Sequence, residues 1–379
     1  MRLSFLLIAA SLHIFGGLPS GEADAGPLMP PRECSSIVLK NHGSPVFGTN
    51  LDHVTVDEGL VFVNKRWVEK TGLYPSADGE HARWISRYAS ITFNLVGFQF
   101  AWAGMNEKGL TLSTMSLNDT EVPALDERPP LDSGEWMQLV LDTCATVEDL
   151  VATDARVSII TVDHYLIADS LGNCAVVEFL NGEMVVHTLQ EMPASVLTNS
   201  IYSEAVATWL QFRDSGDYSG LGSSLERFCL AADRARIFSP GSDEWATAYA
   251  FDTLEIIRGE DFSIHTSQWS IVFDTLNLRV YFRTAATPEI RYVDLETFDL
   301  GCESPVQMLD IQEPLTGDVG DHFFDFSYDI NFEHIQGFMD NWGIDISTYN
   351  LHRILRHFET FPCVARRPRR PSGRSGYGP

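Results

Sequence analysis

The sequence lacks the features of several specialised classes of protein. It has only 26 basic side chains against 52 acidic ones, so its formal charge of −26 would repel nucleic acid. No apolar run reaches the roughly 20 residues that a transmembrane helix needs. Six cysteines in 379 residues are too few for a disulfide scaffold, and neither HExxH nor CxxC is present. We therefore expect no nucleic-acid partner, no membrane insertion, no metal and no cofactor.

What the sequence does contain is enough apolar residues for a core, together with an export signal. Hydrophobic residues make up 44% of the chain, which is typical of a folded protein. Met1-Arg2 is a positive start, residues 3–18 are an apolar run, and Ala23-Asp24-Ala25 has the form of a cleavage site. We expect residues 1–25 to be a signal peptide and the mature protein to be soluble and exported, either periplasmic or secreted.

Short β-type segments separated by Gly- and Pro-containing turns predominate, with helical patterns inserted as blocks. We expect strands at 35–40, 46–52, 59–64, 89–94, 99–104, 110–116, 157–168, 173–179, 184–189, 268–274 and 279–283. We expect helices at 133–151, with Ser133 as N-cap, and at 200–212, 225–238, 243–257 and 347–361. Blocks of this kind favour an α+β fold over a doubly wound parallel sheet. Residues 363–379 are basic and rich in Pro and Gly, which predicts a disordered tail.

Cys34 is the first candidate for chemistry, because it follows a short Pro-bearing pro-segment, residues 26–33, and opens a strand. If cleavage after Glu33 exposes its amine, one residue carries a thiol of pKa about 8.5 and an α-amine of pKa about 8, a nucleophile with its own base. Removal of the signal at Ala25 leaves the pro-segment attached, so this chemistry requires the second cleavage. The alternative is that Cys34 is a buried small hydrophobic residue.

Five short motifs follow one another along the chain. They are Cys34-Ser35-Ser36-Ile37-Val38, Gly48-Thr49-Asn50-Leu51-Asp52, Gly104-Met105-Asn106-Glu107-Lys108-Gly109-Leu110, Val196-Leu197-Thr198-Asn199-Ser200 and Glu226-Arg227-Phe228. Together with residues 165–178 and 266–283, they resemble the choloylglycine hydrolase family, which includes penicillin V acylases and bile salt hydrolases. The resemblance extends from Cys34 to about residue 300. It implies an N-terminal-nucleophile (Ntn) hydrolase with a four-layer αββα sandwich of antiparallel sheets, which we assign to a single catalytic domain at residues 34–362.

The resemblance also implies a set of catalytic residues. Cys34 matches the nucleophile, whose thiolate attacks an amide carbonyl to leave a thioester. Asp52 matches the carboxylate that holds the α-amine, and Asn199 matches the donor that stabilises the oxyanion. Arg227 matches an arginine near the nucleophile, whose charge favours thiolate over thiol. Considered singly, Asp52 also suits a turn cap, Asn199 a helix N-cap and Arg227 an exposed helix position.

Two positions depart from the family pattern. Thr49 stands where many members have Arg, which removes one of two cations expected near the sulfur. The second oxyanion donor falls near Ser116 or Asn118, where two extra residues disturb the register. The departure at Thr49 motivates an alternative, a catalytically impaired member that binds an acyl or sterol ligand. A lipoprotein anchored through Cys34 is a third option, which Arg32 and Glu33 disfavour because lipidation sites have small residues there.

The leading interpretation is an exported cysteine amidase that hydrolyses the C–N bond of a small linear amide with an apolar acyl group. The amide itself stays open among conjugated bile acids, phenoxyacetyl β-lactams, N-acyl homoserine lactones and N-acyl amino acids. A homo-oligomer is possible. If Cys34 is the nucleophile, at least one of the five other cysteines is unpaired, and Cys302 with Cys363 is the pair we favour, because both lie in irregular C-terminal sequence.

Overall fold

The structure, a computed structural model of the chain, describes residues 33–364 with gaps at 44, 54–57, 155, 162, 189–190, 259–265 and 342. The expected signal peptide, residues 26–32 and the chain beyond residue 364 lie outside the described residues, so the expectations for them stay predictions. Within the described part, no helix combines the length and the apolar sequence that crossing a membrane requires.

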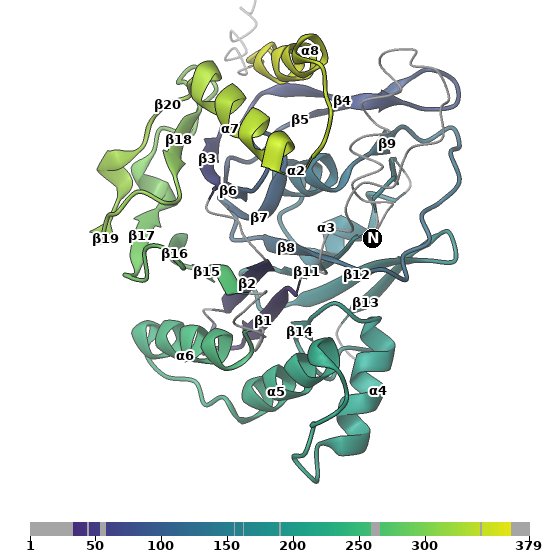
Figure 1. Ribbon diagram of the computed structural model, residues 1–379, viewed down its shortest axis with the longest axis vertical. Helices are drawn as coiled ribbons and strands as arrows, with labels where there is room; N and C mark the ends of the chain where they lie inside the picture. The colour runs from purple at the N-terminus through teal and green to yellow at the C-terminus, as the bar shows by residue number, and fades with distance from the viewer. Residues whose placement is uncertain are drawn as a thin grey trace, which may run out of the picture.

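Two large β-sheets lie face to face at the centre of the molecule (Figure 1). The seven-stranded sheet contains, in spatial order, β14 (Val196–Leu197), β1 (Ser35–Leu39), β2 (Val46–His53), β15 (Thr266–Asp274), β16 (Arg279–Thr284), β17 (Arg291–Asp294) and β19 (Gly317–Asp318). The nine-stranded sheet contains β13 (Glu183–Thr188), β12 (Cys174–Leu180), β11 (Asp163–Ala168), β8 (Thr111–Ser116), β7 (Ala101–Asn106), β6 (Ser90–Asn94), β3 (Leu60–Asn64), β18 (Gln307–Asp310) and β20 (Phe324–Asp325). Neighbouring strands of both sheets are antiparallel, except β17 and β19.

Helices cover the outer faces of the two sheets (Figure 1). The helices α5 (Ser223–Ile237) and α6 (Asp243–Ile256) pack on the seven-stranded sheet, and α4 (Tyr202–Phe212) packs against α5. On the other sheet, α2 (Ser133–Thr143) packs on β7 and β8 and is followed by α3 (Val147–Val151). Outside these layers are α7 (Tyr328–Asn341), α8 (Thr348–Glu359), the hairpin β4 (Glu69–Pro75)–β5 (His81–Ile85) and the short parallel pair β9 (Pro130–Leu131)–β10 (Ser158–Ile159). The predicted four-layer α+β sandwich with antiparallel sheets is confirmed.

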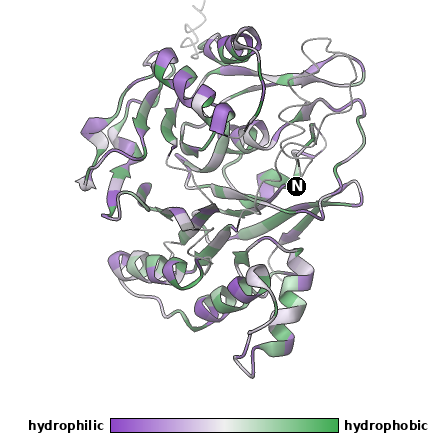
Figure 2. Cartoon of the chain, in the orientation of Figure 1, coloured by the Kyte–Doolittle hydropathy of each residue, from purple (hydrophilic) through white to green (hydrophobic). Residues whose placement is uncertain are grey.

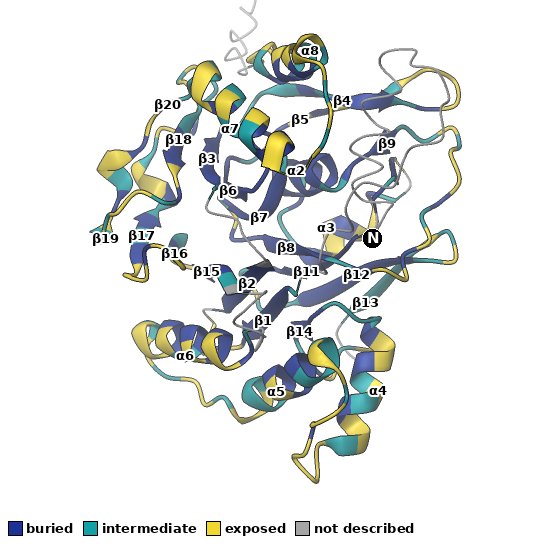
Figure 3. Ribbon diagram, viewed as in Figure 1, coloured by how far each residue is buried: buried dark blue, intermediate teal, exposed yellow. Residues whose placement is uncertain are grey.

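Aromatic side chains fill the space between the sheets. Phe93 on β6 makes edge-to-face contacts with Phe273 and Phe282 of the opposite sheet, with ring centroids 6.0 and 5.4 Å apart. Trp102 meets Trp269 in the same way at 6.0 Å. Apolar residues follow the strands in Figure 2. Figure 3 shows the central strands of both sheets buried, while the outer surfaces of α4 and α6 are exposed. Burial of apolar area between the layers is therefore the main stabilising contribution.

The predicted helix at 133–151 is wrong as a single helix. The backbone of Cys144 is extended, so α2 ends there. A second capping box, formed by Thr146 and Asp149, then begins α3. The N-cap of α2 is Asp132 rather than Ser133, because the Asp132 carboxylate accepts from the backbone N–H of Glu135. A capping box restarts the helix after only three intervening residues, Cys144 to Thr146, so helical spacing continues across the break in the sequence.

The other predicted strands and helices are present, most of them within two residues of the expected ends. The predicted strand 157–168 is divided into β10 and β11. The hairpin β4–β5, the short strands β9 and β14, the strands after β16 and the helix α7 were not predicted. In β4 the charged side chain of Lys70 is buried and lies 2.9 Å from Asp142 of α2. The strand was not predicted because a lysine at a buried position interrupts the apolar pattern.

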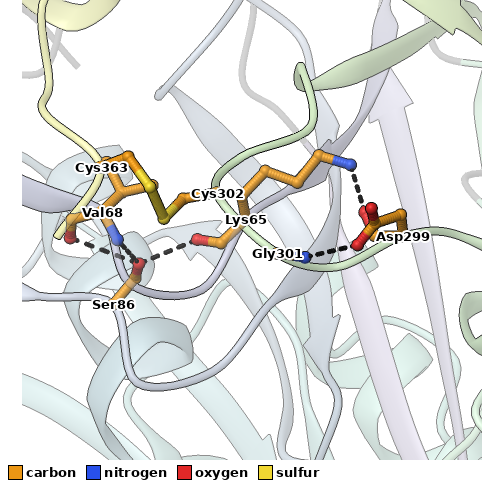
Figure 4. The surroundings of a disulfide bond; sticks show 7 residues. All are labelled: Lys65, Val68, Ser86, Asp299, Gly301, Cys302 and Cys363. Carbon is orange, nitrogen blue, oxygen red and sulfur yellow. Dashed lines mark hydrogen bonds between the residues drawn. A yellow bond between two sulfur atoms is a disulfide. The ribbon is translucent and has the colours of Figure 1, made fainter. Parts of the chain in front are cut away.

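A disulfide joins Cys302 to Cys363, as the sequence suggested, and fastens the end of the described chain to the domain (Figure 4). Cys363 also forms a β-bridge with Val68, and the N–H of Val364 donates to the carbonyl of Trp67 at 2.7 Å. Cys363 and Val364 thus belong to the folded domain, which corrects their assignment to the tail.

Candidate active site

Cys34 immediately precedes β1 and is completely buried in the core between the sheets. β1 is paired with β2 on one side and with β14 on the other (Figure 1). This register brings Asp52, near the end of β2, beside the start of β1, where the N–H of Glu33 donates to the Asp52 carbonyl at 3.1 Å. It also brings Asn199, two residues beyond β14, to the same place. Strand pairing therefore assembles the first three predicted site residues.

Asn199 contacts Cys34 directly. Its Oδ1 accepts from the backbone N–H of Cys34 at 2.8 Å and from Nη2 of Arg227 at 3.1 Å. Its Nδ2 donates to the carbonyl of Ser116 at 2.9 Å, which orients the amide. The amide has a second Nδ2 proton for an oxyanion. The N-cap of α4 is Ile201, so the alternative of Asn199 as a helix cap is wrong.

Arg227 projects from α5 into the core and is only 4% exposed, which removes the alternative of an exposed helix residue. Its Nη1 donates to the Cys34 carbonyl at 2.7 Å and to Ser35 Oγ at 2.6 Å. The rigid fork of a guanidinium thus binds the backbone and the neighbour of Cys34 at once. Arg227 places a positive charge beside the candidate nucleophile.

Glu33 is still joined to Cys34 in this chain, so the Cys34 nitrogen is a peptide amide. The Glu33 carboxylate accepts from Ser223 Oγ at 2.8 Å and lies 3.9 Å from Arg227 Nε. Ser223 lies one helical turn before Arg227 and also accepts from its Nε at 3.3 Å. The sequence motifs did not identify Ser223 as a site residue. Its position four residues before Arg227 places it on the same face of the helix, and this spacing was the one indication in the sequence that the two side chains meet.

The remaining predicted positions differ in how they relate to the site. Asp52 is completely buried and its Oδ1 accepts from Ser267 Oγ at 2.5 Å. Ser116 takes part through its backbone carbonyl, whereas Asn118 is exposed. Thr49 is buried and hydrogen-bonded to Ser36 Oγ, at 2.8 Å. A neutral hydroxyl thus occupies the position where the family pattern has a cation.

Three further cysteines outside the disulfide, Cys144, Cys174 and Cys229, lie in a different electrostatic environment. Burial raises the pKa of the Cys144 and Cys174 thiols to about 11 and that of Cys229 to about 12, so these three stay protonated at neutral pH. Cys34, by contrast, has a guanidinium bonded to its own carbonyl. Among the described residues no group of His, Cys, Asp and Glu is arranged to hold a metal ion.

A cavity of about 550 Å³ lies on the opposite face of the nine-stranded sheet from Cys34. Aromatic and cationic side chains line it, among them Phe98, Phe326, Phe358, Lys65 and Lys70. Along β3, Leu60 and Phe62 pack in the cluster on the cavity side, whereas Val61 and Val63 pack in the cluster that contains Cys34. Since successive side chains of a strand point to opposite faces, the cavity is separate from the candidate active site.

Two antiparallel sheets packed between helical layers, with a cysteine at the start of a central strand, define the class of Ntn hydrolases. Comparisons with known proteins agree. Residues 34–221 match the family model of linear amide C–N hydrolases, choloylglycine hydrolase family. The chain is 24% identical to a penicillin V acylase of Pectobacterium atrosepticum over 299 residues, 68% of this chain and 78% of that protein.

Solved structures show the same fold. A penicillin V acylase from Agrobacterium tumefaciens superposes with a TM-score of 0.69 at 24% identity, over 78% of this chain and 98% of the other. A variant of a conjugated bile acid hydrolase from Clostridium perfringens superposes with a TM-score of 0.60 at 16% identity, over 75% of this chain and 98% of the other. The chain belongs to the choloylglycine hydrolase family of linear amide C–N hydrolases.

Proposed function

We propose that the protein is an exported cysteine amidase that cleaves a small linear amide with an apolar acyl group, after removal of the chain up to Glu33. The observation that carries this proposal is the convergence of Asn199 and Arg227 on Cys34. The family supports the amide class, since its relatives include penicillin V acylases and a conjugated bile acid hydrolase.

The proposed reaction uses Cys34 as both nucleophile and base. Once cleavage frees the α-amine, the amine removes the thiol proton and Sγ attacks the amide carbonyl carbon. The second Nδ2–H of Asn199 stabilises the oxyanion, and Asp52 holds the ammonium. The C–N bond then breaks as the ammonium protonates the leaving nitrogen. Water hydrolyses the thioester with the amine again as base, which releases the acid and restores the thiol.

Replacement of Cys34 tests the proposal. The wild-type chain, expressed with its first 33 residues, should yield a mature protein whose mass begins at Cys34. It should hydrolyse at least one compound of a panel of penicillin V, glycine-conjugated bile acids, N-acyl homoserine lactones and N-acyl amino acids. Cys34→Ala and Cys34→Ser should remove hydrolysis and leave the thermal unfolding curve intact. Cys144→Ala, which alters another buried thiol, is the matched control and should retain activity.

The outcomes separate the proposal from its alternative. A protein that retains residues up to Glu33 and binds a bile acid or an acyl amide without turnover would be the catalytically impaired binder to which Thr49 points. Full activity of Cys34→Ala would contradict the mechanism. Fractionation of cells that express the full chain tests the export.

A further inference from the structure

His164 connects the two sheets behind the candidate active site. It lies on β11 of the nine-stranded sheet, and its side chain is completely buried. Its Nε2 is 2.6 Å from the carbonyl oxygen of Thr198, which follows β14 of the seven-stranded sheet. Its Nδ1 is 3.1 Å from Oε1 of Glu178 on β12. Both ring nitrogens therefore face oxygen atoms.

These contacts specify where the ring protons are. A backbone carbonyl only accepts hydrogen bonds, so Nε2 of His164 must carry a proton toward Thr198. A neutral ring would then present the Nδ1 lone pair to Glu178, which is favourable only if the carboxyl is protonated. An ionised Glu178 instead requires a proton on Nδ1 as well, which makes the ring an imidazolium.

The surroundings of Glu178 favour its ionised form. Its Oε1 also accepts from the backbone N–H of Tyr202 at 2.9 Å, and its Oε2 lies 3.3 Å from Nε2 of His187 on β13. Burial raises the pKa of the Glu178 carboxyl, but the hydrogen bond from His164 and the nearby His187 ring outweigh it and hold the pKa at about 2. In the described contacts, Glu178 and, through it, His187 are the titratable groups that face His164.

Thr198 is joined directly to Asn199, so whatever holds its carbonyl orients the amide that contacts Cys34. On the other side, Ser224 Oγ of α5 accepts from the N–H of Asn199 at 3.0 Å. We infer that His164, as a buried imidazolium paired with Glu178, is a positioning residue that fixes the Thr198–Asn199 peptide and aims the oxyanion donor at the reacting carbonyl. The inference rests on the proposed function only for its catalytic consequence. The doubly protonated state of the His164 ring does not depend on the proposed function, because it follows from the pairing of the buried ring with the Glu178 carboxylate.

The first test is spectroscopic and needs no substrate. The wild-type protein labelled with ¹⁵N-histidine should show one ring with both nitrogens protonated between pH 6 and 8. That signal should disappear in His164→Gln, which assigns it among the 11 histidines. A His164 ring with a single protonated nitrogen in this range would overturn the inference.

The second test measures turnover. His164→Leu should lower kcat about tenfold or more with KM within about twofold, because a misplaced donor weakens transition-state rather than ground-state binding. His164→Gln retains an N–H donor and should recover part of kcat. Alkylation of Cys34 by iodoacetamide should continue in both variants.

The matched control is His357→Leu. His357 Nε2 also donates to a backbone carbonyl, that of Thr71 at 2.7 Å, but on α8 outside the sandwich. It should lower thermal stability without lowering kcat. A His164→Leu protein that loses stability like this control and keeps kcat within twofold of wild type would overturn the positioning role. If His164→Leu does not fold, the kcat of His164→Gln tests the positioning role and the ¹⁵N-histidine spectrum tests the ring protonation. Absence of wild-type turnover would reject the proposed function, while the spectrum would still decide the ring state.

Discussion

Arg227 and Cys34 lie 193 residues apart in the chain, and the guanidinium donates to the Cys34 carbonyl at 2.7 Å. Nη2 of the same guanidinium also donates to Oδ1 of Asn199 at 3.1 Å. One cation thus joins the candidate nucleophile to the candidate oxyanion donor. This arrangement needs the planar, multiply donating guanidinium rather than charge alone.

Arg227→Lys should therefore lower kcat/KM about 10- to 100-fold, because an ammonium keeps the charge but cannot bind both partners in the same geometry. Steady-state kinetics on the best substrate of the panel measures the effect. Arg234→Lys is the control, since Arg234 lies on the same helix and pairs with Asp252 at the surface. Equal activity of the two variants would contradict a role for the guanidinium.

Asn199→Ala should lower kcat by about 10²–10³-fold, the usual cost of removing one oxyanion donor, with a smaller change in KM. Asn199→Asp should be equally impaired, because it replaces the donor with a second acceptor beside the Cys34 nitrogen. Asn173→Ala, a turn position bonded to Asp169, controls for loss of an asparagine. Unchanged kcat in Asn199→Ala would assign the oxyanion to another donor.

Removal of the disulfide should destabilise the fold without removing activity. The bond closes a separation of 61 residues, and loss of a loop of that size costs about 2–4 kcal/mol in the free energy of unfolding. Denaturant unfolding of Cys302→Ser/Cys363→Ser should show this loss. A reductant should destabilise the wild type and leave the double variant unchanged. Identical wild-type curves with and without reductant would contradict the prediction.

The stability of the wild type should fall in acid partly through Glu178. The pKa of its carboxyl is about 2 in the folded chain against the ordinary value of 4.5, so the folded state favours the ionised carboxylate. A depressed folded pKa contributes stability above pH 4.5, and the contribution disappears as the pH falls toward 2. It amounts to about 3 kcal/mol. Glu178→Gln should lose this part of the pH dependence of unfolding, and parallel curves for the two proteins would refute it.

Gly109 should not tolerate a side chain. It has φ +77°, and an added Cβ would lie 2.1 Å from the Thr275 carbonyl oxygen. Gly109→Ala should therefore cost at least about 2 kcal/mol more than Gly79→Ala, which has φ +85° but open space around it. Equilibrium unfolding of the two variants separates the steric contact from the cost of the backbone angle. Equal losses would mean that the loop near Thr275 moves aside.

Several predictions from local pattern agree with the structure because their cause is local. Alternating or continuous apolar runs specified the strands around Cys34 and Asp52, and helical spacing specified α5 with Arg227. Where a local pattern was ambiguous, the prediction was wrong, as at Cys144, where one periodic stretch contains two helices. The hairpin β4–β5 was missed because the buried partner of Lys70 is Asp142, far away in the sequence.

The sequence by itself determined the nature of the candidate site: a cysteine at the start of a strand, and the ordered residues Asp52, Asn199 and Arg227. Tertiary structure alone decided which atoms meet. The pairing of β1 with β2 and β14 brings Cys34 to Asn199, and the packing of α5 on β1 brings in Arg227. The contact of His164 with Thr198 likewise exists only because two sheets lie face to face. Hydrogen bonds between distant segments depend on strand register and layer packing, which no local pattern of residues records.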